Sequence, residues 1–161
     1  MAALEESQGE PAEAPTFMHP AYELVDGDKI VRKDVPPPTS AEQDAEENRT
    51  LLSEMVRYVT TTMLSMGFHE KWIPHEEAEA KCPIYCTEGW ESAPKLLVVI
   101  INQVGSQAGL WSRSLCFSHG LKSGSMLEYL QHAIDAGYAV MVLNPNSNSV
   151  TLPGEPGSAS G

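Results

Sequence analysis

The sequence is poor in basic residues, and this shortage makes direct nucleic-acid binding improbable on physical grounds. Ten Lys and Arg residues stand against 22 Asp and Glu residues, which gives a net charge of −12. Affinity for DNA or RNA comes chiefly from neutralisation of phosphates by Lys and Arg. The one basic cluster, Lys29, Arg32 and Lys33, is short and ringed by acidic residues. We therefore expect no direct contact with nucleic acid or with an anionic membrane surface.

Cysteines and long apolar segments are also scarce. Three cysteines, an odd number, argue against a disulfide framework and for a reducing compartment. The first residues have neither the basic nor the apolar region of a secretory signal, and no segment approaches the length of a transmembrane helix. The prediction is a protein of the nucleus, the cytoplasm or both.

The motifs of several enzyme classes are missing. There is no G-x-G-x-x-G and no Gly-Lys-Ser phosphate loop, and no window has the G-x-S-x-G pattern of a hydrolase nucleophile. Serines near the loop after the apolar segment at 95–101 are candidates without a visible base: Ser106, Ser112 and Ser114. A catalytic triad cannot be assembled from these residues. We predict no catalytic residues and no enzyme activity.

Histidine and cysteine spacings are off the pattern of structural zinc sites. The residues tested, His69, His75, Cys82 and Cys86, give H-x5-H followed by C-x3-C, whereas such sites favour C-x2–4-C joined to H-x3–5-H. No metal site and no cofactor site is predicted.

The other chemically interesting side chains have simpler interpretations. Cys116 is expected to be a small core residue and His132 an exposed one, while His119 lies in a polar loop without a visible partner.

The most strongly apolar segment that is present covers residues 95–101, Lys-Leu-Leu-Val-Val-Ile-Ile. Its six apolar residues do not alternate with polar ones, which is typical of a strand covered on both faces. A central strand of a mostly parallel sheet, with helices on both sides, fits this pattern.

A second strand follows through a crossover helix. The apolar stripe over 126–136 predicts a helix that Ser125 can cap and Gly137 ends, and residues 138–143 form another buried-type strand. Strand, helix, strand is a βαβ unit, so the strands at 97–101 and 139–143 should be parallel neighbours.

The amino-terminal half contains a hairpin and a long helix. Apolar residues around Asp26-Gly27 predict two short strands joined by a tight turn. Ser40 and Gln43 form a possible capping box, an apolar stripe runs to Met66, and Gly67 suits the end of a helix. Its residues Met55, Met63 and Met66 are interpreted as core, with an adaptable binding face as the alternative. Residues 69–80 are expected to form loops, and 83–87 a short edge strand.

Three stretches resemble a known family. They are residues 95–101; Gly-Leu-Trp-Ser-Arg at 109–113; and Ala-Gly-Tyr, a short apolar strand and Leu-Asn-Pro-Asn within 133–146. In these the chain is similar to the Argonaute-binding protein two (Arb-type) domain family, in its animal cotranscriptional-regulator branch. The resemblance covers roughly residues 17–150.

This resemblance implies a partial α/β-hydrolase-like fold in a protein that acts through protein partners. The implied partners are Argonaute and chromatin or splicing factors, in gene silencing or in chromatin or splicing regulation. We expect a disordered acidic tail at 1–16, the amino-terminal part of the domain at 17–150 and a disordered tail at 151–161.

The chain departs from the family's pattern in two places. Asn102-Gln103 stands where the family has His-Gly, and the chain stops where the family continues to the nucleophile turn. A truncated or decayed, non-catalytic interaction protein is the leading hypothesis. A serine-hydrolase-like esterase and a chain that does not fold stably are the alternatives.

Overall fold

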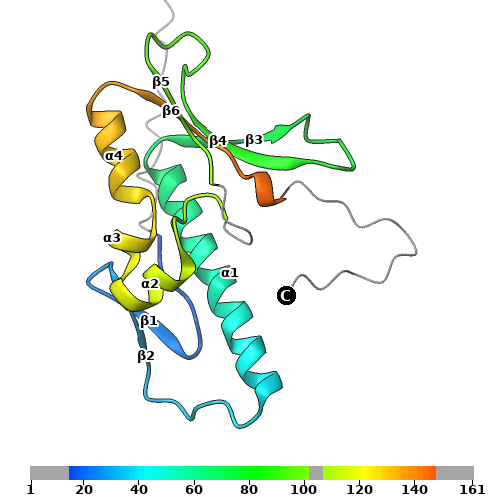
Figure 1. Cartoon of the computed structure of the whole chain (residues 1–161), viewed down its shortest axis with the longest axis vertical. Coiled ribbons are helices and arrows are strands. Elements are labelled where there is room, and N and C mark those ends of the chain that lie inside the picture. Colours follow the sequence, from blue (N-terminus) through cyan, green and yellow to red (C-terminus); the bar gives the residue numbers. More distant parts are fainter. Residues whose placement is uncertain (1–14, 102–106, 148–161) are drawn as a thin grey trace, which may run out of the picture.

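The computed structural model describes residues 15–101 and 107–147, which form two sheets and four α-helices (Figure 1). One sheet pairs β1 (Tyr22–Val25) with β2 (Lys29–Arg32). The other has the order β3-β4-β6-β5, with bounds Phe68–Ile73, Cys82–Thr87, Ala139–Val142 and Leu96–Val99. The helices are α1 (Ala41–Ser65), α2 (Arg113–His119), α3 (Leu121–Gly124) and α4 (Leu127–Asp135), and the 3-10 helix η1 covers Pro145–Ser147. The expected disordered tails lie largely outside the described residues, so the predicted domain limits stay predictions.

The predicted hairpin is confirmed. β1 and β2 are antiparallel, and the turn residues Asp26 and Gly27 have φ angles of 52° and 66°, as an Asp-Gly turn requires. The residue after the turn fastens the hairpin to α3. Leu121 N–H donates to the Asp28 main-chain oxygen at 2.8 Å, and Lys122 N–H donates to the Asp28 carboxylate at 2.9 Å.

The long helix is confirmed as well. Ser40 is the N-cap of α1 and its hydroxyl accepts the Gln43 N–H at 3.2 Å, while the Gln43 side chain bonds Thr39 instead of closing the box on Ser40. The helix ends at Ser65 with Met66 as its C-cap, and Gly67, the residue after the cap, has a φ of 94°. Met55 and Met63 are fully buried and Met66 is half-buried, so the methionine stripe is core, as predicted.

The βαβ unit is present. β5 and β6 are parallel neighbours with Leu96 opposite Ala139, and α4 connects them along the chain. The helix begins one residue later than its pattern suggested, because Met126 occupies the N-cap position; Leu127 N–H reaches the Ser125 hydroxyl at 3.4 Å.

The sheet is mixed, so the prediction of a mostly parallel sheet is wrong. β4 is antiparallel to both β3 and β6, and only β5 and β6 are parallel. The connection between β3 and β4 spans residues 74–81, which is too short for the crossover that parallel neighbours need. The hydrolase-like architecture is not confirmed by this arrangement.

Two strand assignments were also wrong. Phe68–Ile73, expected to lie mainly in a loop, is the strand β3, whose polar composition reflects its exposed position at the sheet edge. The strand that contains Pro83, expected at an edge, lies inside the sheet as β4. Pro83 is tolerated there because β6 pairs only with Tyr85 and Cys86.

The continuous apolar run is buried on one face alone, contrary to prediction. Val99 and Ile101 are buried, whereas Leu96, Val98 and Ile100 are exposed to 40%, 43% and 61%. The helices α1 and α4 pack against only one face of this sheet, so the side chains of β5 alternate between core and surface. An unbroken apolar run does not distinguish this arrangement from a central strand.

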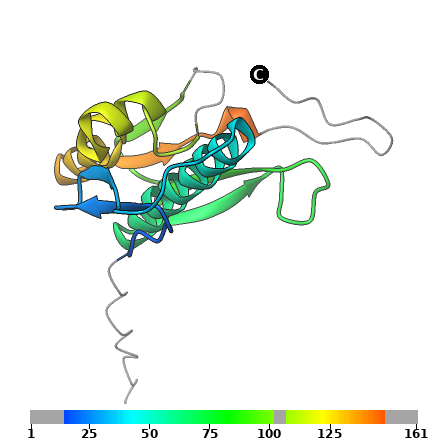
Figure 2. The ribbon, with the colours of Figure 1, turned by 90° about the horizontal axis from the view of Figure 1, so that it is seen from below.

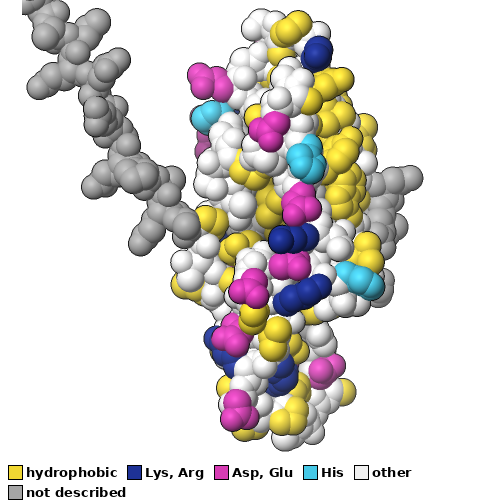
Figure 3. Space-filling model, turned by 90° about the vertical axis from the view of Figure 1, so that its left-hand side faces the viewer, with side chains coloured by type: hydrophobic (Ala, Val, Ile, Leu, Met, Phe, Trp, Pro, Cys, Tyr) yellow, Lys and Arg dark blue, Asp and Glu magenta, His cyan; other side chains and the backbone are white. Residues whose placement is uncertain are grey.

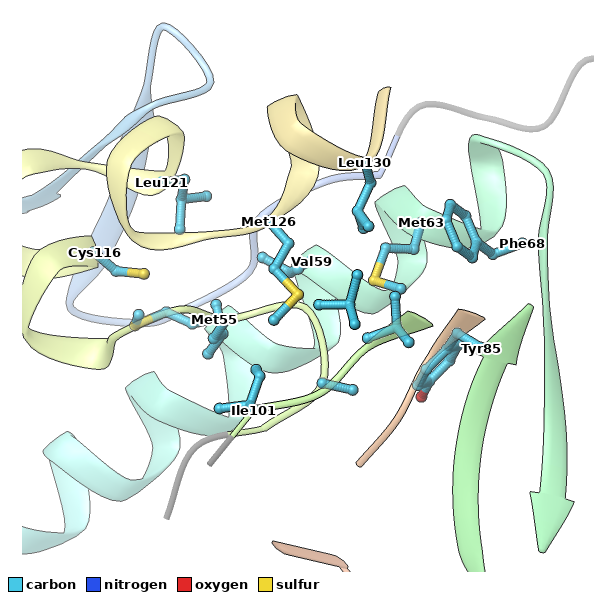
Figure 4. Packing of buried hydrophobic residues seen from close by; sticks show 14 of the residues in the cluster. Met55, Val59, Met63, Phe68, Tyr85, Ile101, Cys116, Leu121, Met126 and Leu130 are labelled. Atoms are coloured by element: carbon cyan, nitrogen blue, oxygen red, sulfur yellow. The ribbon is translucent and has the colours of Figure 1, made fainter. Parts of the chain in front are cut away.

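The core lies between α1, α4 and one face of the larger sheet. Figure 4 shows Met63 of α1, Leu130 of α4 and Tyr85 of β4 converging there, with Met126 and Val59 beside them. Figure 2 shows α1 running between the hairpin and the larger sheet. The short helices α2 and α3 were not predicted, and the buried residues Cys116 and Leu121 attach them to this core. Among the described residues, no helix is long and apolar enough to cross a membrane.

Gly124 is the tightest point of the α2–α3 packing, and its replacement should destabilise the fold. A Cβ atom there would lie 2.3 Å from the Cys116 main-chain nitrogen. We expect Gly124→Ala to lower the free energy of unfolding by about 1–3 kcal/mol, the usual cost of overpacking. Urea denaturation followed by circular dichroism measures it. Ser123→Ala, at the exposed neighbouring position, is the control and should change the value by less than about 0.5 kcal/mol.

Candidate functional site

The carboxyl ends of parallel strands are the usual ligand position in α/β sheets, and here this position belongs to β5 and β6. Asn144, just after β6, is 6% exposed; its main-chain oxygen accepts the Cys82 thiol at 2.8 Å. Its side-chain oxygen has no hydrogen-bond partner among the described residues. The loop after β5, including Asn102, Gln103 and the candidate Ser106, lies outside those residues.

The two other candidate serines have a structural role. Ser112 is the N-cap of α2, where its hydroxyl accepts the Leu115 N–H at 3.4 Å and lies 2.9 Å from the Ser114 hydroxyl. Among the residues that the structure describes, neither hydroxyl has a histidine or a carboxylate as its hydrogen-bond partner. This arrangement supplies no base for an attacking serine.

The histidines and cysteines tested for zinc are not gathered into one site. His69 and His75 are exposed, whereas Cys82 and Cys86 are buried in β4. Burial raises the pKa of both thiols, which disfavours the thiolate form that binds metals. Within the part of the chain that the structure describes, no three His, Cys, Asp or Glu side chains are grouped to hold a metal ion.

The other three candidate residues, Cys116, His119 and His132, occupy positions that require no functional role. Cys116 is fully buried, as predicted, and burial raises its pKa to about 11. His119 ends α2 with its Nδ1 2.7 Å from the Ser118 hydroxyl. His132 is exposed on α4, as expected.

A buried histidine, which the sequence patterns did not reveal, holds the segment before the hairpin against α1. His19 is 4% exposed, and its Nδ1 accepts the Ala21 N–H at 3.1 Å while its Nε2 lies 3.1 Å from the Thr50 hydroxyl. Because Nδ1 accepts a hydrogen bond, the ring is neutral with its proton on Nε2. Burial lowers the pKa of His19, although Glu47 and Glu54 oppose this effect.

A buried carboxylate fastens the same segment one helical turn further along α1. Glu54 is 7% exposed; it accepts hydrogen bonds from Arg57 at 2.7 Å and from the Met18 N–H. Burial alone would raise the pKa of Glu54, but these hydrogen bonds bring it below its usual value. Arg57 also donates to the Thr16 main-chain oxygen. The sequence held one sign of this contact, because Glu54 lies among the apolar residues of the α1 stripe.

A second ion pair joins the hairpin to α1. The Arg32 guanidinium binds both carboxylate oxygens of Glu47, donates to the Tyr22 hydroxyl at 3.1 Å and lies 5.3 Å from the centre of its ring. Hydrogen bonding to Glu47 raises the pKa of Arg32. These contacts anchor the amino-terminal segment against α1. Beside it lies an open groove of about 770 Å³, whose lining includes residues of α1 together with His19 and Pro20.

Exposed aromatic side chains gather around α4. Trp111 and Tyr129 pack edge to face with ring centres 5.6 Å apart, and the Lys95 ammonium lies 5.3 Å from the centre of the Tyr138 ring. A groove of about 310 Å³ runs between this helix and β5, lined by Leu97, Tyr129, His132, Ala133 and Tyr138. Exposed aromatic residues of this kind are enriched at protein–protein interfaces. The composition of this surface is therefore that of a protein-binding surface.

Comparison with known proteins gives one family. The model of the Arb2 domain matches residues 40–154, about seven tenths of the chain. The cotranscriptional regulator ARB2A homolog of Dictyostelium discoideum is 39% identical over 84 residues, which are 52% of this chain and 22% of that protein. Cotranscriptional regulator ARB2A of Mus musculus is 39% identical over 77 residues, 47% of this chain and 18% of that protein.

A more distant relative is a FAM172 family protein homolog of Caenorhabditis elegans, 33% identical over 73 residues, 45% of this chain and 23% of that protein. The chain thus spans about a fifth of the length of the curated relatives that it matches. No solved structure matches it.

The buried His19 should make stability depend on pH. Its pKa is lower in the folded protein than in the unfolded chain, so the unfolded state binds more protons as the pH falls. The contribution of neutral His19 is complete above about pH 6.5 and is lost as the pH drops below that value. We expect His19→Gln to reduce the fall in unfolding free energy between pH 7.5 and pH 5.5, measured by urea denaturation. His132→Gln, on the surface, should leave the fall unchanged, and an equal effect of both variants would contradict the assignment.

Proposed function

Because the chain belongs to the Arb2 domain family, we propose that it is a non-catalytic interaction protein that takes part in cotranscriptional regulation. The observation that carries this proposal is the match of the domain together with relatives that are named as cotranscriptional regulators. The site agrees with it, since the exposed aromatic groove beside α4 offers a surface for a protein partner.

The non-catalytic part of the proposal has its own support. The sequence has no G-x-S-x-G segment, and Ser112 and Ser114 lie at a helix cap instead of beside a base. Asn102-Gln103 replaces the His-Gly pair that the family resemblance leads us to expect. An α/β-hydrolase-like ancestry is part of this proposal: the parallel β5 and β6 joined through α4 are compatible with it.

The proposed partners are proteins: Argonaute and chromatin or splicing factors, as the resemblance implies. The proposed location is the nucleus, with the cytoplasm as a second site. A net charge of −12 favours basic protein surfaces over direct contact with nucleic acid. The proposed organisation keeps an interaction domain at 17–150 between tails at 1–16 and 151–161.

Affinity purification of the tagged full chain from nuclear extract tests the proposal. We expect quantitative mass spectrometry to recover Argonaute, chromatin or splicing proteins above an untagged control. Val140→Asp places a charge in the fully buried centre of β6 and serves as the misfolded control, which should lose the same partners.

Two results would contradict the proposal. One is that the folded wild-type chain recovers none of these proteins above background. The other is that a fluorophosphonate probe labels a single serine of the native chain stoichiometrically, because this would show an activated nucleophile.

A further inference from the structure

Residues 15–20, the clasp, precede the hairpin and contain neither helix nor strand. Figure 2 shows them, in dark blue, beside α1. Of these residues, only Phe17 packs against the apolar core, while Met18 is 65% exposed. The match of the Arb2 domain begins at residue 40, so the clasp also lies outside the matched stretch. Its attachment to α1 therefore depends chiefly on polar contacts.

One end of the clasp is fastened by charges that do not titrate near neutral pH. The buried Glu54 carboxylate accepts the Met18 N–H and is paired with Arg57, which also donates to the Thr16 main-chain oxygen. Burial raises the pKa of Glu54 and its hydrogen bonds lower it, so that the pKa lies below its usual value. This end of the clasp keeps its charges at pH 5.5.

The other end of the clasp depends on the protonation of His19. Its Nδ1 accepts the Ala21 N–H, and its Nε2 lies 3.1 Å from the Thr50 hydroxyl. The Lys33 ammonium donates to the His19 main-chain oxygen at 2.7 Å. A second proton on the ring would occupy Nδ1 and face the Ala21 N–H, and two donors cannot form a hydrogen bond with each other. Protonation therefore removes this contact.

The groups around the ring favour its neutral form. Two carboxylates of α1, two cations at the end of the hairpin and one phenol of β1 face His19: Glu47, Glu54, Arg32, Lys33 and Tyr22. Both carboxylates already have guanidinium partners, so neither is free to stabilise a charged ring. Figure 3 shows Lys and Arg side chains beside Asp and Glu over the lower part of the molecule, which contains the hairpin.

We propose that the clasp is a proton-sensitive strap, which leaves α1 when His19 is protonated while the sheets and helices stay folded. The hairpin behind it stays in place because it has attachments of its own. These are the Arg32–Glu47 ion pair and the hydrogen bond from the Lys122 N–H to the Asp28 carboxylate. Opening widens the groove of about 330 Å³ between the clasp and α1. The inference does not depend on the proposed function.

Linkage sets the size of the effect. An unperturbed histidine has a pKa of about 6.5, and burial gives His19 a lower pKa when the clasp is closed. The open clasp therefore binds more protons as the pH falls, so closure is favoured above about pH 6.5 and weakens below it. Between pH 7.5 and pH 5.5 the equilibrium constant for opening rises by at most about tenfold.

Amide hydrogen exchange of the full chain, followed by NMR, tests the strap. Rates are divided by those of unstructured peptides, which removes the chemical effect of pH on exchange. We expect the protection of the Met18 and Ala21 amides to fall about threefold to tenfold between pH 7.5 and pH 5.5. In 1 M urea the protection of both should change less than about twofold, whereas that of the central β6 amides should fall about tenfold through global unfolding.

Matched variants assign the effect to one side chain. His19→Gln should remove the pH dependence because glutamine does not titrate, whereas His132→Gln, exposed on α4, should keep it. Circular dichroism shows whether each variant is folded. If His19→Gln is not, Thr50→Val replaces it: this variant removes the hydroxyl beside Nε2 and should make the Met18 and Ala21 amides exchange at least about threefold faster at pH 7.5.

Several results would overturn the proposal. Equal urea dependence of the clasp and β6 amides would show that the clasp opens only when the whole chain unfolds. Amides of Met18 and Ala21 without protection at pH 7.5 would show that it is never closed. A pH effect that is absent from the wild type, or that persists in His19→Gln, would show that His19 does not control it. Unchanged exchange in Thr50→Val would do the same.

Discussion

The pairing of β6 with strands on both of its sides is the constraint on which the rest of the structure depends. β6 is parallel to β5 and antiparallel to β4, so it joins the crossover unit to the rest of the sheet. Its residues Val140 and Val142 are fully buried against α1 and α4. Burial of a valine side chain contributes about 1.5–3 kcal/mol. The two valines of β6 therefore contribute substantially to holding the β5–α4–β6 unit against the rest of the sheet. Because β6 lies between β4 and β5, β5 is an edge strand of the described sheet.

Local patterns predicted the elements better than their arrangement. The stripe and the caps of α1, the Asp-Gly hairpin and the strand–helix–strand unit follow from spacing within short segments, and the structure contains all of them. The sheet order depends on contacts between segments far apart in the chain. An apolar run such as 96–101 and a polar strand such as Phe68–Ile73 carry no information on which strand lies next to which, so both were misassigned. The family resemblance, in contrast, is confirmed by the match of the Arb2 domain.

In the candidate site, too, local features could be predicted from the sequence and contacts between distant segments could not. The absence of a nucleophile motif could be read from the sequence, whereas the position of Ser112 as the N-cap of α2 could not, because that helix was not predicted. The buried His19 and its bonds to Thr50 and Ala21 could not, because a single histidine before the hairpin has no periodic pattern. The exposed stripe of β5 was not predicted for a related reason: apolar composition predicts burial, and here only one face of the strand packs against the core.

The central claim, that within residues 15–101 and 107–147 β5 pairs with β6 on one side and with no strand on the other, is tested most directly by amide hydrogen exchange in the isolated monomer. The account predicts slow exchange at Leu97 and Val99, whose N–H groups face β6, and exchange at least tenfold faster at Leu96 and Val98. Uniform protection of all four amides in the monomer would show that the edge is already covered, and would contradict the account.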